Sequence, residues 1–197
     1  MAESEFVIDP TILPIEDAHW RVWDISGEGV SSPPSRWAVK DGTISQLSNI
    51  FLGSATEANS EVERYGTLRI YQDAMPFTDG YMELQMRSDD DDSVGVIFRS
   101  QDEKHHYLFS SDRQRNFSIL AVKNGDDYRI LATYDRAYQP GKWHQLKVTM
   151  DGANLQIDLD EQRLLEASDA TFSAGTIGLH SWGSDKVQFR NIRLKAR

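Results

Sequence analysis

Four consecutive aspartates, Asp89 to Asp92, form the densest group of candidate metal ligands in the sequence. Carboxylates this close repel one another unless a cation or water balances their charge. Calcium takes six to eight oxygen ligands, and carboxylates on loops commonly supply them. Because alternate side chains of an extended turn diverge, only two or three of the four can face one ion. The spacing lacks the pattern of the helical calcium-binding loop, so a cation site and a solvated turn both remain open.

Aromatic side chains next to polar loops are the second candidate group, because a flat ring can stack on the apolar face of a sugar. Trp23 and Trp182 border the polar segments "WDISGEG" and "WGSD". We expect these two to contact a ligand, together with His180 and Tyr107. Trp37 and Trp143 stand at strand positions that are typical of core residues. The competing interpretation places every tryptophan in the core.

Arg99 lies on the opposite face of its expected strand from the apolar residues Val96 and Phe98. With Arg87 and Gln85 of the neighbouring strand, it is expected to form a polar row that binds hydroxyl groups or a carboxylate. A cross-strand charge ladder that includes Glu83 explains the same pattern.

Catalytic signatures are sparse in this sequence. Glycoside hydrolysis needs two carboxylates flanking the scissile bond, and Asp158 and Asp160 share a strand face but lie on an expected outer strand. His105 and His106 are adjacent on a strand and point to opposite faces, so they cannot jointly hold zinc. The chain is therefore expected to bind rather than to catalyse, with a glycoside-acting enzyme as the alternative.

Composition limits the partners. The 197 residues include 31 acidic and 21 basic side chains, and the net charge of −10 disfavours nucleic acid. There is no apolar run long enough for a membrane helix, and the first residues show no signal peptide, so we expect no membrane insertion. The sequence has no cysteine, which excludes disulfides and thiolate chemistry.

Strand patterns separated by turn residues must position these side chains. In "GYMELQM", Met82, Leu84 and Met86 alternate with Tyr81, Glu83 and Gln85. In "SVGVIFR", Val94, Val96 and Phe98 alternate with Gly95, Ile97 and Arg99, so both segments have a period of two. Turn sequences such as "NGDD", "QPGK" and "DGAN" separate many short strand patterns, and no segment has a convincing helical period. This predicts an all-β fold, an antiparallel β-sandwich of jelly-roll type.

The domain organisation follows from the same patterns. Residues 1–197 are expected to form a single domain, and residues 1–19 an N-terminal extension that packs as a strand or arm. The segments 27–36 and 53–64 read as long loops, which commonly carry function in a compact sandwich.

The segment Asp90–Phe98 resembles the Asp-Asp-Asp-Tyr-Ala-Gly-Phe-hydrophobic-Phe segment of the thrombospondin C-terminal domain. Residues 175–194 are similar to the closing Gly-x-Leu-Gly, aromatic and Asn-Leu pattern of that family. Trp37, Gln46 and Asn49 match its Trp, Gln and Asn. Ser93 replaces the family's tyrosine, and the family's cysteine is absent. The layout also resembles laminin-G-like domains and the carbohydrate-binding modules of bacterial enzymes and adhesins.

This resemblance implies a concanavalin A-like, L-type lectin-like sandwich that binds Ca²⁺ and mediates adhesion outside the cell. Asp90, Asp91 and Asp92, with Asp89 and Asn49, would be the metal ligands. The expected function is a calcium-binding, lectin-like module of a larger surface protein, which recognises a glycan or a cell-surface protein. The expected location is extracellular or at the cell surface. The alternative is a keto-disaccharide hydrolase-like enzyme or its non-catalytic accessory domain.

Overall fold

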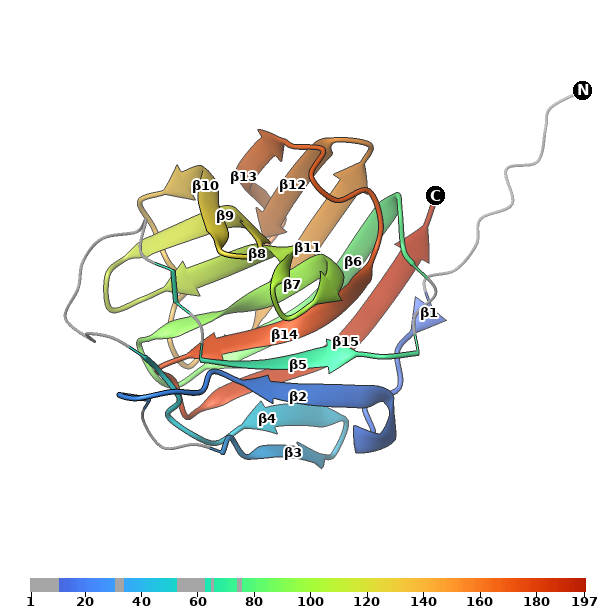
Figure 1. Cartoon of the computed structure of the whole chain (residues 1–197). Helices are drawn as coiled ribbons and strands as arrows, with labels where there is room; N and C mark the ends of the chain where they lie inside the picture. Colours follow the sequence, from blue (N-terminus) through green and yellow to red (C-terminus); the bar gives the residue numbers. More distant parts are fainter. Residues whose placement is uncertain (1–10, 31–33, 53–62, 65, 74–75) are drawn as a thin grey trace, which may run out of the picture.

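The computed structural model describes residues 11–30, 34–52, 63–64, 66–73 and 76–197. Within them, two antiparallel sheets face each other (Figure 1). Sheet A contains, in spatial order, β13 (Gln162–Ser168), β12 (Asn154–Leu159), β11 (His144–Asp151), β6 (Gly80–Ser88), β15 (Val187–Ala196), β4 (Thr43–Gln46) and β3 (Trp37–Lys40), and β1 (Thr11–Ile12) pairs with β15. Sheet B contains β10 (Asp127–Tyr134), β9 (Phe117–Asn124), β8 (His105–Asp112), β7 (Ser93–Asp102), β14 (Thr176–Trp182), β5 (Thr67–Tyr71) and β2 (Trp20–Asp24).

The predicted all-β sandwich is confirmed. The only described helix is the 3₁₀ turn η1 (Asp17–His19), and no described helix is long and apolar enough to cross a membrane. Of the N-terminal extension, Thr11 and Ile12 form a strand beside β15, while residues 1–10 lie outside the described part of the chain. Of the two expected loops, residues 31–33 and 53–62 also lie outside it.

The core between the sheets is built from the alternating residues of the predicted strands. Met82, Leu84 and Met86 of β6 are fully buried, and so are Val94, Val96 and Phe98 of β7. The residues between them face the other side of each sheet, and Ile97 joins a second apolar cluster on the outer face of sheet B. The register of β6 and β7 thus follows the hydrophobic alternation.

Strand β7 connects two features at opposite ends of the sandwich, the acidic turn at its start and a bend near its end. It begins directly after the acidic turn 89–92 and ends at Asp102, ten residues later. Its pairing with β14 and β8 shifts near Arg99, whose φ of 46° bends the strand. The acidic turn and the bent end of β7 therefore lie at opposite ends of sheet B.

Candidate functional site

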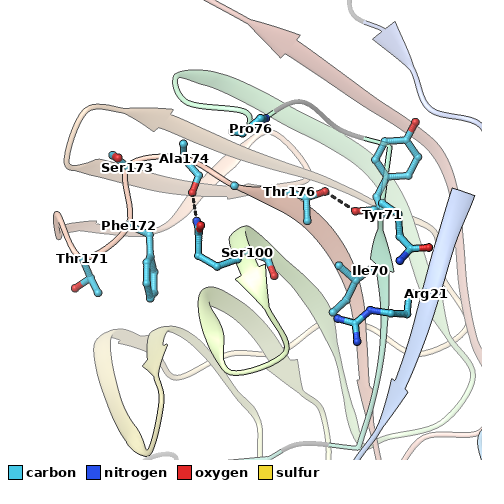
Figure 2. A pocket seen from close by; sticks show the side chains of 13 residues that line it. Arg21, Ile70, Tyr71, Pro76, Ser100, Thr171, Phe172, Ser173, Ala174 and Thr176 are labelled. Carbon is cyan, nitrogen blue, oxygen red and sulfur yellow. Dashed lines mark hydrogen bonds between the residues drawn. The ribbon is translucent and has the colours of Figure 1, made fainter.

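An open pocket of about 690 Å³ lies at the bent end of β7. We call it the end pocket. It forms where β2, β5, β7 and β14 meet the loop of residues 171–175 (Figure 2). Its size falls within the range of small-ligand sites in proteins. Its lining residues are Arg21, Ile70, Tyr71, Gln72, Pro76, Ser100, Gln101, Thr171, Phe172, Ser173, Ala174, Gly175 and Thr176.

The loop that closes the end pocket is held tightly against β7. Gly175 has a φ of 154°, and a Cβ at this position would lie 2.3 Å from the carbonyl carbon of Arg99. Only glycine fits such a close approach of two backbones. Gly175 also exchanges two backbone hydrogen bonds with Phe77. The loop is therefore fixed on both sides, and the pocket has a defined wall.

Hydroxyl and amide groups dominate the polar lining of the end pocket. Gln101 donates its side-chain N–H to the Ala174 carbonyl, and Thr176 Oγ1 donates to the Tyr71 carbonyl at 2.7 Å (Figure 2). Among the described residues, the side chains of Gln72 and Ser173 make no hydrogen bond, although both line the pocket. These groups are free to exchange hydrogen bonds with the hydroxyls of a ligand.

The charge of the end pocket is nearly balanced. Arg21 is its one charged lining residue, and it donates a hydrogen bond of 2.9 Å to Glu103. The same hydrogen bond lowers the pKa of the Glu103 carboxyl below its usual range. Because the positive charge of Arg21 is balanced by the negative charge of Glu103, the pocket suits an uncharged polar ligand.

Two residues that were expected to contact a ligand instead anchor the pocket loop. Arg99 is buried and donates hydrogen bonds to the carbonyls of Thr78, Gly152 and Phe172 and to the Asp79 carboxylate. It does not join a polar row with Arg87 and Gln85, because those two residues lie on β6 in sheet A, whereas Arg99 lies on β7 in sheet B.

Tyr107 is also fully buried. Its hydroxyl donates to the Asp169 carboxylate at 2.7 Å and accepts a hydrogen bond from the Phe172 amide at 3.1 Å. Burial raises the pKa of the Tyr107 hydroxyl to about 12, so it stays protonated. Arg99 and Tyr107 together position residues 169–172 at the rim of the end pocket.

The outer face of sheet B carries a second group of polar side chains. We call it the polar face; it comprises His106, Asp112, Lys123 and His180, with Arg64 above them. Lys123 pairs with Glu63 at 2.8 Å, Arg64 lies 3.7 Å from Asp112, and His180 contacts the Arg64 carbonyl at 3.0 Å. Burial lowers the pKa of both His106 and His180 to about 4, so both imidazoles are neutral at pH 7. Neither imidazole lines the end pocket, and both shifts follow from burial.

Neither expected tryptophan is an open stacking platform. Trp182 is 1% exposed, and the Arg115 guanidinium lies 4.9 Å from the centre of its ring. Its ring therefore has no face available to a sugar. Trp23 is half-buried and packs against Leu68 and Ile70 on the outer face of sheet B. His180, expected to contact a ligand, is fully buried within the polar face.

Arginines supply much of the positive charge that the acidic turn requires. Arg87 binds Asp89 at 2.8 Å, and Arg115 binds Asp92 at 3.1 Å. Burial raises the pKa of the Asp92 carboxyl to about 6, although the hydrogen bond from Arg115 opposes this.

The turn nevertheless brings three carboxylates together. One oxygen from each of Asp90, Asp91 and Asp92 lies within 4.8 Å of the others. Asn49 is exposed on the segment after β4, and its neighbour Ile50 accepts a hydrogen bond from Gly183, close to Asp92. Three carboxylates supply only part of the six to eight oxygens that calcium takes.

The residues of the end pocket that sequence reasoning missed come from distant parts of the chain. Gln72, Ser100, Ser173 and Thr176 carry no motif, and only strand pairing brings them together. Nothing in the sequence indicated that Gln101 lines a pocket either.

Comparison with known proteins identifies a family. Residues 17–195 match the model of the 3-keto-alpha-glucoside-1,2-lyase-like domain. A levanase of Bacillus subtilis (strain 168) is 30% identical over 99 residues, which are 49% of this chain and 14% of the levanase. The chain therefore spans only a small part of that enzyme. The matching family agrees with the keto-disaccharide hydrolase-like alternative expected from the sequence, and differs from the thrombospondin C-terminal and laminin-G-like families.

Solved structures agree on the fold. Carbohydrate binding module CBM66 from Bacillus subtilis superimposes with a TM-score of 0.64 at 20% identity, over 83% of this chain and 93% of the module. A β-1,3-1,4-glucanase (lichenase) from a mouse hindgut metagenome has a TM-score of 0.61 at 11% identity, over 96% and 99% of the two chains. At these identities the likeness concerns the sandwich fold alone, which hosts both binding modules and hydrolases.

Proposed function

Because the chain belongs to the 3-keto-alpha-glucoside-1,2-lyase-like domain family, we propose that it binds an uncharged carbohydrate in the end pocket. The observation that carries this proposal is the lining of that pocket. It combines free amide and hydroxyl groups, the Arg21–Glu103 ion pair and the half-buried ring of Phe172 in about 690 Å³. Groups of this kind hydrogen-bond sugar hydroxyls and pack on sugar C–H faces.

The names of the similar proteins suggest the first ligands to try. Levan fragments follow from the levanase, and methyl α-D-glucoside follows from the family description. Both are neutral, as the balanced charge of the end pocket requires. As part of a larger protein, such a domain would keep that protein bound to its carbohydrate substrate.

Removing free polar groups from the end pocket is expected to weaken binding. For Gln72→Ala and Ser173→Ala we expect affinity losses of about three- to tenfold each, because each change deletes one ligand hydrogen bond. Gln188→Ala, on sheet A, is the matched control and should leave the affinity unchanged. Isothermal titration with levan fragments measures all three. Equal affinity in the wild type and both pocket variants would place the sugar elsewhere.

A second candidate function is the lyase reaction that the family description names. Such a reaction needs a base for the C2 proton, made acidic by the ketone at C3, and an acid for the oxygen that leaves C1. The neutral imidazoles of His106 and His180, with Lys123, are the groups that favour it. Because these side chains are buried, a substrate reaches them less easily than it reaches the open end pocket, and we place the lyase reaction second to carbohydrate binding.

Incubation with methyl 3-keto-α-D-glucoside, followed by NMR for released methanol, tests the lyase reaction. If the chain is a lyase, the wild type releases methanol and His180→Gln does not. Release that survives in this variant would remove His180 from the reaction, and binding without release would leave the chain a binding module.

Calcium at the acidic turn, and action outside the cell, stay predictions. The convergence of Asp90, Asp91 and Asp92 supports a cation there, and the Arg115–Asp92 pair opposes it. If calcium binds the folded chain, millimolar calcium raises the melting temperature above its value in EDTA, and Asp90→Asn/Asp91→Asn removes the rise. Asp126→Asn, in the exposed turn between β9 and β10, is the control for charge. Identical melting in calcium and EDTA would contradict the prediction.

A further inference from the structure

We propose that a second pocket, at the opposite end of the sandwich from the end pocket, binds an acidic sugar through Arg136. We call it the lateral pocket. It has a volume of about 310 Å³ and lies between the connection from β10 to β11 and the turn from β12 to β13. Tyr134, Arg136, Lys142, His144, Asp160 and Gln162 supply its polar and aromatic lining.

The one carboxylate in the lateral pocket is already satisfied. Asp160 accepts hydrogen bonds from His144 Nδ1 at 2.8 Å and from the Gln145 amide at 3.0 Å, and Lys142 lies 3.6 Å away. Although burial opposes it, these partners lower the pKa of the Asp160 carboxyl below its usual range. Asp160 therefore stays ionised and committed to its own neighbours.

Arg136 has no such partner. Among the described residues, no carboxylate lies within ion-pair distance of its guanidinium, and the side chain makes no hydrogen bond. Arg136 is exposed and lines the lateral pocket, so its guanidinium is accessible to a ligand there. A planar guanidinium binds a planar carboxylate through two parallel hydrogen bonds. The Arg136 guanidinium in the lateral pocket can therefore bind an anionic ligand.

Tyr134 adds the feature that favours a sugar over a simple anion. The residue is 41% exposed, and its hydroxyl makes no hydrogen bond among the described residues. With Arg136 it also lines an adjoining hollow formed with Asn116, Thr133 and Asp135. A ring that borders two hollows beside a free guanidinium can stack on one face of a sugar whose carboxylate reaches Arg136.

The lateral pocket is independent of the end pocket. Tyr138, which lines it, donates a hydrogen bond to the Asp90 carbonyl in the acidic turn, at the start of β7. Ser100 and Gln101 of the end pocket lie near the end of that ten-residue strand. The two sites therefore differ in place and in preferred charge, and the proposal for the lateral pocket stands without the one for the end pocket.

Titration of the full chain with methyl β-D-glucuronide, methyl β-D-glucoside and sodium acetate tests the proposal. NMR monitors the backbone amides of residues 134–139, 141 and 142 and the side-chain Nε–H of Arg136. We expect saturable shifts there with the glucuronide and none with the glucoside. Arg136→Gln should weaken glucuronide binding at least about tenfold, and Tyr134→Ala by a smaller factor, because a charge-assisted hydrogen bond exceeds one ring contact.

Arg193→Gln is the matched control, since Arg193 is exposed on sheet A and makes no ion pair among the described residues. It should bind the glucuronide as the wild type does. Glucuronide affinity that is unchanged in Arg136→Gln would overturn the proposal. Equal shifts with the glucoside would contradict the preference for a negatively charged ligand. Equal shifts with acetate would contradict the claim that the pocket recognises a sugar rather than any carboxylate. Loss of binding in Gln72→Ala instead would assign the ligand to the end pocket.

Discussion

Replacing Arg99 by methionine is expected to destabilise the fold by roughly 3–5 kcal/mol and to open the end pocket. The buried guanidinium satisfies the carbonyls of Thr78, Gly152 and Phe172 and pairs with Asp79. Methionine fills a similar volume but leaves these acceptors without donors. Since Phe172 belongs to the pocket loop, sugar affinity should fall as well.

Urea denaturation of Arg99→Met and Arg99→Lys measures this effect. Lysine keeps the charge but lacks the planar fork, so it should recover only part of the lost stability. Arg193→Met is the control and should change the free energy of unfolding by less than about 0.5 kcal/mol, as exposed substitutions generally do. If Arg99→Met unfolds with nearly the wild-type free energy, Arg99 does not anchor these loops.

Acidification is expected to destabilise the protein through His106 and His180. Burial lowers their pKa to about 4, whereas an unfolded histidine titrates near 6.5. Between these values the unfolded chain binds protons that the folded chain does not. The stability from each neutral imidazole is therefore present above pH 6.5 and is lost as the pH falls through 4. Near pH 4 the loss approaches ~3 kcal/mol for each histidine.

Denaturation of the wild type and of His180→Gln at pH 7 and at pH 4.5 isolates this contribution. Glutamine keeps a hydrogen-bonding side chain but does not titrate, so the variant should lose less stability between the two pH values. Ser110→Ala, on the same face of sheet B, removes no titrating group and should lower the stability equally at both. A wild-type pH dependence in both His180→Gln and His106→Gln would contradict the neutral, buried imidazoles.

Hydrophobic alternation predicted the strands that form the centre of each sheet, but two strands, β5 and β2, were not identified from it. Met82, Leu84 and Met86 alternate with polar residues, and β6 follows this pattern. In β5, Leu68 and Ile70 alternate with Thr67 and Arg69, but they pack in the outer cluster of sheet B and Arg69 is also buried, so the residue types do not mark the core face. The short edge strand β2 carries one tryptophan on each side of sheet B, Trp20 in the core and Trp23 in the outer cluster.

The site was less predictable than the fold, because it depends on which distant segments meet. Arg99 and Tyr107 were recognised as unusual polar and aromatic residues, but the sequence did not reveal that they hold the loop around Phe172. Trp182 borders a polar turn in the sequence, yet it ends β14 beneath Arg115. The residue type indicates what a side chain can do, whereas strand pairing decides what it touches.

Mapping the binding of levan fragments on the folded chain by ¹H–¹⁵N NMR is the most direct test of the central claim. The account predicts that the largest shifts occur at the amides of Gln101, Ser173 and Thr176, and that the amides of Asp90 to Asp92 stay in place. Shifts confined to the acidic turn or to the lateral pocket, with the end pocket unchanged, would contradict the assignment of the end pocket as the carbohydrate site.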